Sequence, residues 1–481
     1  MISFILSKLN KNRASLFLLA GNAIVTIVNF LIMAFFSHKL SIEINATYRQ
    51  LFMFLALGSA FGNAGFAQAI YFQLNKTKKI FSDFEIISTG RFLLFCSAFF
   101  TTGLAYFLMP AFIDNFSNPE FSKIAWLGLG ILFFTIIQAS DFSIYLYKQK
   151  VKRYFLISIS AVILKLIIAY YLYTTGFDIV YFVISILFIS AFTFFYSLLI
   201  LRGKKAFFNF SINNQQVKQQ IVYALPIGLA IIAGLWMTQI DKLVLNYYIH
   251  DLRSFVVLSN GSIELPFLST LYVSFSMIAM PMMIKAYENG EINRLLEERN
   301  SYIKMIATVI IPVTIALIFW SDKIILLAFG SEYQDSAPLF ALFSTILFSR
   351  ICSYQDIILL TGRTKYLTYI QGIELFFHFL ITVFFISNFG IMGAPIASVI
   401  THYLYVLVIS SISANLLKIS PLRLIPLNFI LSIFAVGAVS ILPFVFIHQF
   451  LEVSVNQLFW IFELIVFLVL NYFLLLFIQK R

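Results

Sequence analysis

Charged side chains are scarce in this sequence. Asp, Glu, Lys and Arg make up only 11% of its 481 residues, whereas hydrophobic residues make up 61%. A soluble domain has about 25% charged and about 45–50% apolar residues, so this chain has too few polar side chains to cover a surface in water. The composition excludes an ordinary soluble protein and indicates a chain that folds in lipid.

Cysteines and nucleotide motifs are also lacking. The two cysteines, Cys96 and Cys352, lie within apolar segments without metal-ligand spacing around them, so we expect neither a redox nor a metal role. The sequence has no GxxxxGK[ST] phosphate loop, which argues against nucleotide hydrolysis by this chain. We therefore expect no cofactor and no enzymatic activity.

Apolar runs long enough to cross a bilayer follow one another along the chain. At about 20 residues per span they predict an all-α polytopic membrane protein with about fourteen transmembrane helices. The basic residues before the first run resemble a secretory signal, but residues 15–36 are too long for a signal core and lack a cleavage site, so a retained first helix is expected. The predicted spans lie near residues 15–37, 50–73, 88–110, 123–147, 154–174, 179–201, 219–248, 255–284, 303–328, 337–360, 366–387, 391–415, 424–447 and 457–478.

The positions of Lys and Arg orient these spans. With the amino terminus inside, 24 of the 33 basic residues fall in cytoplasmic tails and loops, 5 fall outside and 4 lie within spans. Such an asymmetry in short loops predicts that both termini are cytoplasmic. The net charge of +12 is thus explained by topology and by contact with membrane lipids rather than by binding of nucleic acid.

The two halves of the chain show weak internal similarity. The segment at 45–70 parallels the segment at 252–279 in hydropathy, and the basic turn QKVKRYF parallels the turn TGRTKYL. Transporters are often built from repeated bundles. We therefore predict an amino-terminal bundle of six helices (1–210), a second bundle of six (211–418) and two additional transmembrane helices (419–481).

Four segments, in a fixed order, carry a resemblance to a known family. They are ALPIGLAIIAGLWMTQIDKLVLN, FGSEYQDSAPLF, LLTGRTKYLTYIQGIE and NFGIMGAPIASVITHYLY. In these segments the sequence resembles the polysaccharide transport family, the oligosaccharide flippases of the multidrug/oligosaccharidyl-lipid/polysaccharide exporter superfamily. The resemblance implies a flippase in the bacterial cytoplasmic membrane that moves a polyprenyl-diphosphate-linked oligosaccharide for O-antigen, capsule or exopolysaccharide synthesis. It also allows a polysaccharide polymerase or ligase as a protein partner.

Basic side chains inside the predicted spans are the first candidates for binding the diphosphate, because a charge in hydrocarbon is costly without a cavity or a partner. Lys165 is the strongest, since it lies near the middle of its span, too deep to reach the interface easily. A lysine paired with an acid for packing is the alternative. The other candidates are Lys242, Arg350 and Arg91, although snorkelling to the interface would also explain Arg91. Asn29 belongs to a polar stripe on the first span that could bind sugar hydroxyls or tie helices together.

Acidic residues and a histidine form a second group, with expected roles in gating or coupling. Glu374 lies about level with Arg350 on the neighbouring span, and His378 follows Glu374 by one helical turn. A structural ion pair would explain Arg350 and Glu374 equally well, whereas a lone histidine within a span is more often a hydrogen-bonded packing residue. Asp241 and Glu264 lie at similar depths near Lys242 and are expected to position it. Asp141, Asp356 and Glu463 are assigned no role.

Three other functions are alternatives to an oligosaccharide flippase. A cation-coupled multidrug exporter of the same superfamily would need an acidic cavity, and the acids above keep it open. A flippase of the peptidoglycan lipid precursor would have an arginine cluster in its first two helices, which this sequence lacks. A polymerase or glycosyltransferase would need a large outer loop, and the longest connection here, residues 285–302, lies on the cytoplasmic side.

Overall fold

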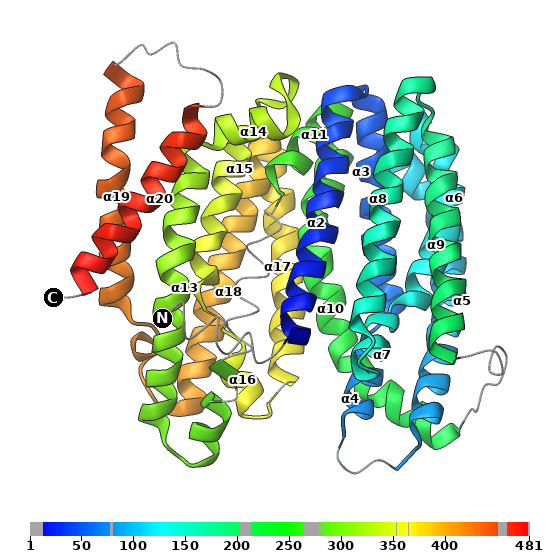
Figure 1. Cartoon of the computed structure of the whole chain (residues 1–481), viewed down its shortest axis with the longest axis horizontal. Helices are drawn as coiled ribbons and strands as arrows, with labels where there is room; N and C mark the ends of the chain where they lie inside the picture. The colour runs from blue at the N-terminus through cyan, green and yellow to red at the C-terminus, as the bar shows by residue number, and fades with distance from the viewer. Residues whose placement is uncertain are drawn as a thin grey trace. The chain divides into compact units, whose positions relative to one another are not determined.

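The computed structural model describes residues 13–76, 80–202, 213–263, 279–280, 282–352, 354–363, 365–450 and 459–479. Side chains are described within these ranges except for residues 13–19, 201–202, 448–450 and 476–479. All regular elements in this part of the chain are helices (Figure 1). They form two compact units. The all-α polytopic fold predicted from the sequence is confirmed.

The first unit contains Met1–Val256 together with Gln371–Phe379. Its helices are α2 (Arg13–Lys39), α3 (Ile42–Asn63), α4 (Phe66–Leu74), α5 (Asp83–Phe116), α6 (Pro119–Gln138), α7 (Asp141–Tyr147), α8 (Val151–Thr175), α9 (Ile179–Arg202) and α10 (Asn214–Ile249), followed by the start of α11 (Leu252–Gly261).

The second unit contains Val257–Ile370 and Leu380–Arg481. Its elements are α13 (Ile292–Phe319), α14 (Ser321–Phe329), η1 (Ser331–Tyr333), α15 (Ser336–Ser344), η2 (Thr345–Ile351), α16 (Asp356–Leu360), the two ends of α17 (Lys365–Phe389), η3 (Gly390–Met392), α18 (Gly393–Leu417), η4 (Pro421–Leu424), α19 (Leu427–Phe450) and α20 (Phe459–Gln479). Within this unit α19 and α20 pack against each other and against α13. The predicted division at 210 and 418 is not tested by these units and stays a prediction.

Every predicted span overlaps at least one of these helices. By length and hydropathy, nine helices of the described residues could cross a membrane, or ten if the bent pair α3–α4 counts as one span. The number is smaller than fourteen for three reasons. α17 and α18 count as one helix (Lys365–Leu417), Ser336–Ile351 and Phe459–Leu475 are shorter than 18 residues, and most of the predicted span at 255–284 lies outside the described residues. The count of fourteen does not conflict with this result and stays a prediction.

Large apolar side chains on the surface of the first unit identify its lipid-facing sides. Phe100, Phe107, Phe188 and Phe192 are 66%, 79%, 70% and 68% exposed, respectively. A soluble protein would bury such rings, because exposed aromatic area is costly in water and not in hydrocarbon. The chain is therefore a multi-pass membrane protein.

A close helix crossing shapes the first unit. α3 and α4 meet at 47°, and Gly65 between them has φ of +79°, a left-handed conformation that favours glycine. A Cβ on Gly65 would lie 2.3 Å from the carbonyl oxygen of Ala224, and a Cβ on Gly228 of α10 would lie 2.3 Å from that of Ala64. The two glycines allow the α3–α4 bend to touch the backbone of α10.

Candidate functional site

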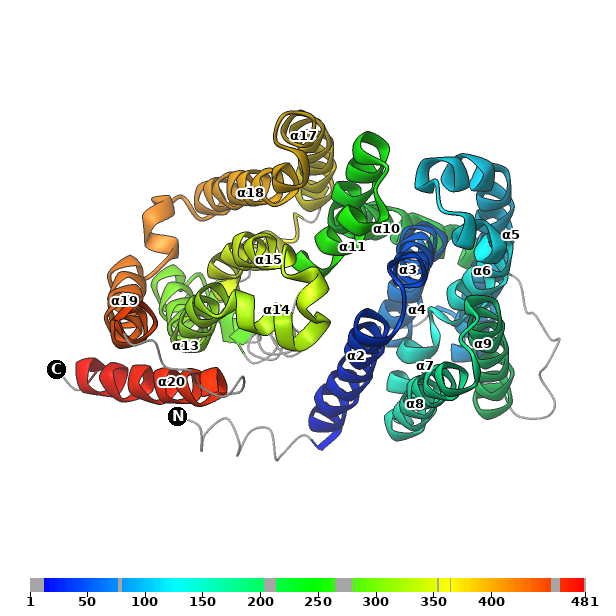
Figure 2. The same ribbon diagram turned by 90° about the horizontal axis from the view of Figure 1, so that it is seen from above.

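Five helices of the first unit form a closed ring of neighbours. The contacts run from α2 to α8, then to α9, α6, α3 and back to α2 (Figure 2). Gly21 of α2 lets α8 come close, because a Cβ there would lie 2.2 Å from the ring of Phe155. Side chains of α2, α6, α7, α8 and α9 line a cavity of about 340 Å³, which we call the unit 1 cavity.

Lys165 of α8 lines the unit 1 cavity. It is the fifteenth of the 25 residues of α8, so it lies near the middle of this helix. Among the described residues it has no ion-pair or hydrogen-bond partner, and its side chain is half-buried. An ammonium group at this depth needs water or an anion to solvate it, so the cavity can hold either.

Most of the polar side chains that line the unit 1 cavity are uncharged. Gln138 of α6 donates a hydrogen bond to the carbonyl of Ser190 (2.9 Å) and accepts one from the hydroxyl of Thr193 (3.1 Å). Thr135, Tyr145, Tyr154, Ser158 and Ser197 also line the cavity. Amide and hydroxyl groups of this kind both donate and accept hydrogen bonds, as sugar hydroxyls require.

Arg91 and Asp141 form an ion pair at the edge of this cavity. Nη2 of Arg91 on α5 lies 2.7 Å from Oδ1 of Asp141, and the side chains are 5% and 8% exposed. Asp141 itself lines the cavity. The sequence assigned no role to Asp141, because an acid near a helix end, 50 residues from its partner, is not distinguishable from an interface residue.

Asp241 and His378 are brought together. Nε2 of His378 on α17 lies 3.1 Å from Oδ1 of Asp241 on α10, and both side chains are buried. Both residues belong to the first unit, as does Glu374, one turn before His378. The pairing of Asp241 with His378 was not predicted, since the sequence linked Asp241 to Glu264, which lies outside the described residues.

The remaining candidates lie in less distinctive surroundings. Nζ of Lys242 lies 3.4 Å from the carbonyl oxygen of Thr238 and 3.3 Å from Oε1 of Gln239. Asn29 is half-buried on α2. Arg350 is half-buried in η2 of the second unit, whereas Glu374 belongs to the first, so the predicted level pairing of these two residues stays a prediction.

A second buried arginine, which the sequence placed in a cytoplasmic loop, lies inside α13. Nε of Arg299 is 3.0 Å from Oδ2 of Asp356, and the side chains are 1% and 3% exposed. Arg299 also donates to the carbonyl of Leu424 and lies 3.7 Å from the sulfur of Cys352. The reason for the difference is that α13 begins at Ile292, eleven residues before the predicted span.

No group of three His, Cys, Asp or Glu side chains that could hold a metal ion occurs in the part of the chain that the structure describes. The chemistry available at the unit 1 cavity is therefore that of one ammonium group, an arginine–aspartate pair and neutral hydrogen-bonding groups.

Comparison with solved structures identifies the fold. The lipid II flippase MurJ, in an inward closed conformation, is similar with a TM-score of 0.73 and 18% identity, over 97% of this chain and 99% of that one. An inward-facing multidrug resistance transporter of the MATE family, in the MOP superfamily, has a TM-score of 0.63 at 14% identity over 82% and 96%. A MOP superfamily transporter from Pyrococcus furiosus has 0.59 at 13% over 84% and 95%.

Comparison at the level of sequence identifies the family. None of the curated proteins compared with this sequence matches it. A family model described as "Polysaccharide biosynthesis protein" matches residues 47–338, more than half of the chain. This multi-pass membrane protein therefore belongs to the polysaccharide biosynthesis protein family, as the resemblance in its sequence predicted.

Proposed function

We propose that this protein is a flippase that moves a polyprenyl-diphosphate-linked oligosaccharide across the bacterial cytoplasmic membrane for the synthesis of a surface polysaccharide. The observation that carries the proposal is the position of Lys165, a basic side chain near the middle of α8 that lines a partly polar cavity. Membership of a family of polysaccharide biosynthesis proteins supports the same substrate class.

The unit 1 cavity suits the two chemical parts of such a substrate head. The ammonium group of Lys165 can pair with a diphosphate oxygen, and the amide of Gln138 and neighbouring hydroxyls can bind sugar hydroxyls. A volume of about 340 Å³ is within the range of ligand pockets, roughly 300–1,000 Å³. The prenyl tail needs no site in the cavity, because it stays in lipid.

In this mechanism the head enters from the cytoplasmic side, and alternating access exposes it on the opposite side. Arg91, Lys242, Arg350 and Asn29 are proposed as further contacts for the head on its way. Use of the product by a polymerase or ligase would give the net direction.

Coupling to protons is proposed at Asp241 and His378, with Glu374 one turn away. Protonation of His378 would strengthen its attraction to the Asp241 carboxylate across 3.1 Å, since only the imidazolium is charged. Such a pair could change the equilibrium between two arrangements of α10 and α17, provided that its two protonation states favour them differently. Glu264 is proposed as a further acid, which would position Lys242.

A cation-coupled multidrug exporter is the second candidate, and the acids Asp241 and Glu374 favour it. Its cavity would bind cations, so a lysine in the unit 1 cavity would oppose transport rather than serve it. The two functions therefore predict opposite effects of removing the charge of Lys165.

The test is deletion of the gene, followed by measurement of surface polysaccharide and of lipid-linked intermediates on each face of the membrane. We expect surface polysaccharide to be lost and intermediates to accumulate on the cytoplasmic face. Restoration by the wild-type gene but not by Lys165→Ala would support both the function and the site. Unchanged polysaccharide and intermediates after deletion would refute the proposed function.

The matched control is Lys152→Ala, on the same helix. Lys152 is exposed near the start of α8 and does not line the unit 1 cavity, so we expect this variant to restore polysaccharide fully. Lys165→Arg keeps the charge and should restore part of it. Normal polysaccharide with Lys165→Ala, at normal protein abundance, would remove Lys165 from the site.

A further inference from the structure

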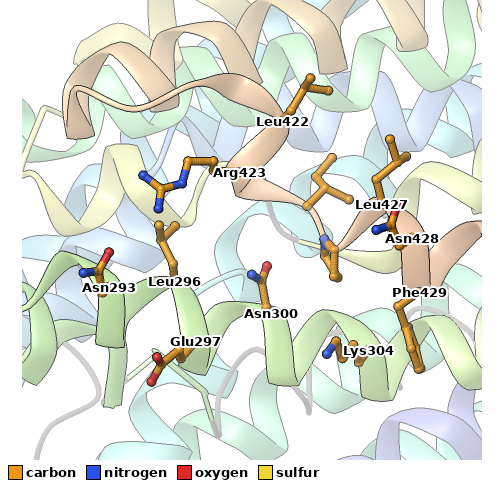
Figure 3. A pocket seen from close by; sticks show the side chains of 12 residues that line it. Asn293, Leu296, Glu297, Asn300, Lys304, Leu422, Arg423, Leu427, Asn428 and Phe429 are labelled. Carbon is orange, nitrogen blue, oxygen red and sulfur yellow. The ribbon is translucent and has the colours of Figure 1, made fainter. Parts of the chain in front are cut away.

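The second unit contains an open groove with a volume of about 810 Å³ that the proposed function does not use (Figure 3). One side is formed by α13, through Asn293, Leu296, Glu297, Asn300 and Lys304. The other side is the segment from η4 to the start of α19, residues 422–429. We call this the α13–α19 groove.

Both sides of the α13–α19 groove change from polar to apolar sequence at the same place. In α13, residues 292–304 contain five charged residues, whereas residues 305–319 contain none. After Arg423, the chain contains no charged residue up to residue 447. The groove therefore lies where a bilayer passes from its headgroup layer to its hydrocarbon layer. By the predicted topology this is the cytoplasmic leaflet.

The groove carries two basic side chains on opposite sides. Lys304 on α13 and Arg423 on η4 are both exposed, and Figure 3 shows them flanking Asn300. Nζ of Lys304 lies 5.4 Å from the ring centre of Phe429, which leaves its other side open to an anion. Glu297 is the one carboxylate among the lining residues, so the lining has a net positive charge.

The side-chain oxygen of one amide that lines the groove lacks a hydrogen-bond partner among the described residues. Oδ1 of Asn300 is buried and has no hydrogen-bond partner among the described residues. A buried polar atom without a partner is costly. Because an amide can be rotated to present either its oxygen or its N–H groups, Asn300 could meet a phosphate oxygen or a headgroup hydroxyl.

The groove is held in shape by the buried Arg299. Its guanidinium group pairs with Asp356 at 3.0 Å and donates to the carbonyl of Leu424, which holds the η4 segment against α13. The backbone positions that carry Lys304 and Arg423 are therefore held at a fixed spacing by a buried contact. A pre-organised pair of cations binds an anion at a smaller entropy cost than a mobile pair.

We propose that the α13–α19 groove binds the phosphate of an anionic phospholipid headgroup from the cytoplasmic leaflet. Lys304 and Arg423 pair with the phosphate, and Asn300 bonds to the headgroup. Leu422, Leu427 and Phe429 offer apolar surface to the start of the acyl chains. This site is separate from the unit 1 cavity and does not depend on the flippase function.

The test uses the purified full chain in detergent. Native mass spectrometry measures binding of short-chain phosphatidylglycerol and, for comparison, phosphatidylcholine. We expect the wild type to prefer phosphatidylglycerol and the double variant Lys304→Gln/Arg423→Gln to bind it about 30-fold more weakly. The matched control is Arg363→Gln/Lys365→Gln, which removes two exposed basic residues elsewhere in the second unit and should bind like the wild type.

Two further measurements test the proposed site independently of the double variant. Glu297→Gln removes the carboxylate from the groove and should tighten binding of phosphatidylglycerol, even if the double variant fails to fold. Inorganic phosphate should not displace the lipid at equal concentration, because it cannot use the apolar wall. Equal binding by the double variant and its control would overturn the proposal, as would unchanged binding by Glu297→Gln. Displacement by inorganic phosphate would show a site for soluble anions instead.

Discussion

The two units each contain a buried arginine–aspartate pair in a comparable place. In the first unit Arg91 of α5 pairs with Asp141, and in the second Arg299 of α13 pairs with Asp356. Each aspartate is the first residue of a short helix, α7 or α16, after a break in the predicted span. In the predicted six-plus-six arrangement the pairs join the third and fourth spans of each half, which is where a repeated bundle would place them.

The surroundings of the two pairs differ. Arg299 also binds the carbonyl of Leu424, and both members of its pair are almost fully buried. Asp141 lines the unit 1 cavity, and its pair is slightly more exposed. The same contact thus fixes the fold in the second unit, whereas in the first it also borders the candidate site. The difference shows that the same kind of contact can be purely structural in one unit and can border the candidate site in the other.

The largest expected effect is that of Arg299→Leu. It leaves the Asp356 carboxylate buried without its partner, and breaking a buried pair in this way costs about 4 kcal/mol. The free energy of unfolding, measured by denaturant titration in detergent micelles, should fall by about this amount. The double variant Arg299→Met/Asp356→Leu removes both charges and should recover most of the loss. No recovery would mean that packing by the arginine stem, rather than the ion pair, stabilises the second unit.

A smaller loss of stability is expected for Arg91→Leu. Water in the unit 1 cavity can partly solvate the remaining Asp141 carboxylate, so the cost should be about 3 kcal/mol or less. The Arg91→Leu variant should nevertheless fail to restore surface polysaccharide in the deletion strain. The Asp141 carboxylate, without its arginine, would compete with the substrate diphosphate for Lys165. The double variant Arg91→Leu/Asp141→Asn, which also removes the carboxylate charge, should restore part of the surface polysaccharide. Equal losses of stability for Arg91→Leu and Arg299→Leu would remove the difference between the two pairs.

The helices could be predicted from the sequence, whereas the pairs could not. Span positions follow from apolar length alone, so every predicted span overlaps a helix. Lys165 could be named because a single lysine in the middle of an apolar run is visible in one segment. Its position on the cavity wall depends on how α8 turns toward α6 and α9, which the sequence does not specify.

Contacts between distant residues explain what was missed. His378 and Asp241 are 137 positions apart, and Arg299 and Asp356 are 57 apart. No local pattern distinguishes the correct partner among several acids at similar depth. Arg299 was also placed in a loop, because its charged surroundings hide the first three turns of α13.

A contact without charge in the first unit should have an intermediate effect. Gly228→Ala would place a Cβ 2.3 Å from the carbonyl oxygen of Ala64, and overpacking of this kind costs about 2 kcal/mol. Gly234→Ala on the same helix meets nothing within 4 Å and should stabilise α10 by about 0.5–1 kcal/mol. Measurement of both variants by the same titration separates backbone crowding from helix propensity. Equal effects would mean that the α3–α4 bend does not press on α10.

The smallest loss of stability is expected for a third aspartate, Asp251, which lies at the start of a helix. Asp251 directly precedes α11 and lies between two predicted spans. Its carboxylate accepts hydrogen bonds from the backbone N–H (2.7 Å) and the hydroxyl (2.6 Å) of Ser254. Partial burial raises the pKa of Asp251, but the bonds from Ser254 outweigh it and hold the pKa below its usual value. A depressed pKa stabilises the fold above the unfolded-state value of about 3.9, and this contribution is lost as the pH falls through the folded-state pKa. Asp251→Ala should therefore cost about 1 kcal/mol at pH 7, and the difference from the wild type should shrink when the titration is repeated below pH 3.9. If the difference between Asp251→Ala and the wild type were instead the same at pH 7 and below pH 3.9, the charge of the Asp251 carboxylate would not be what stabilises the start of α11.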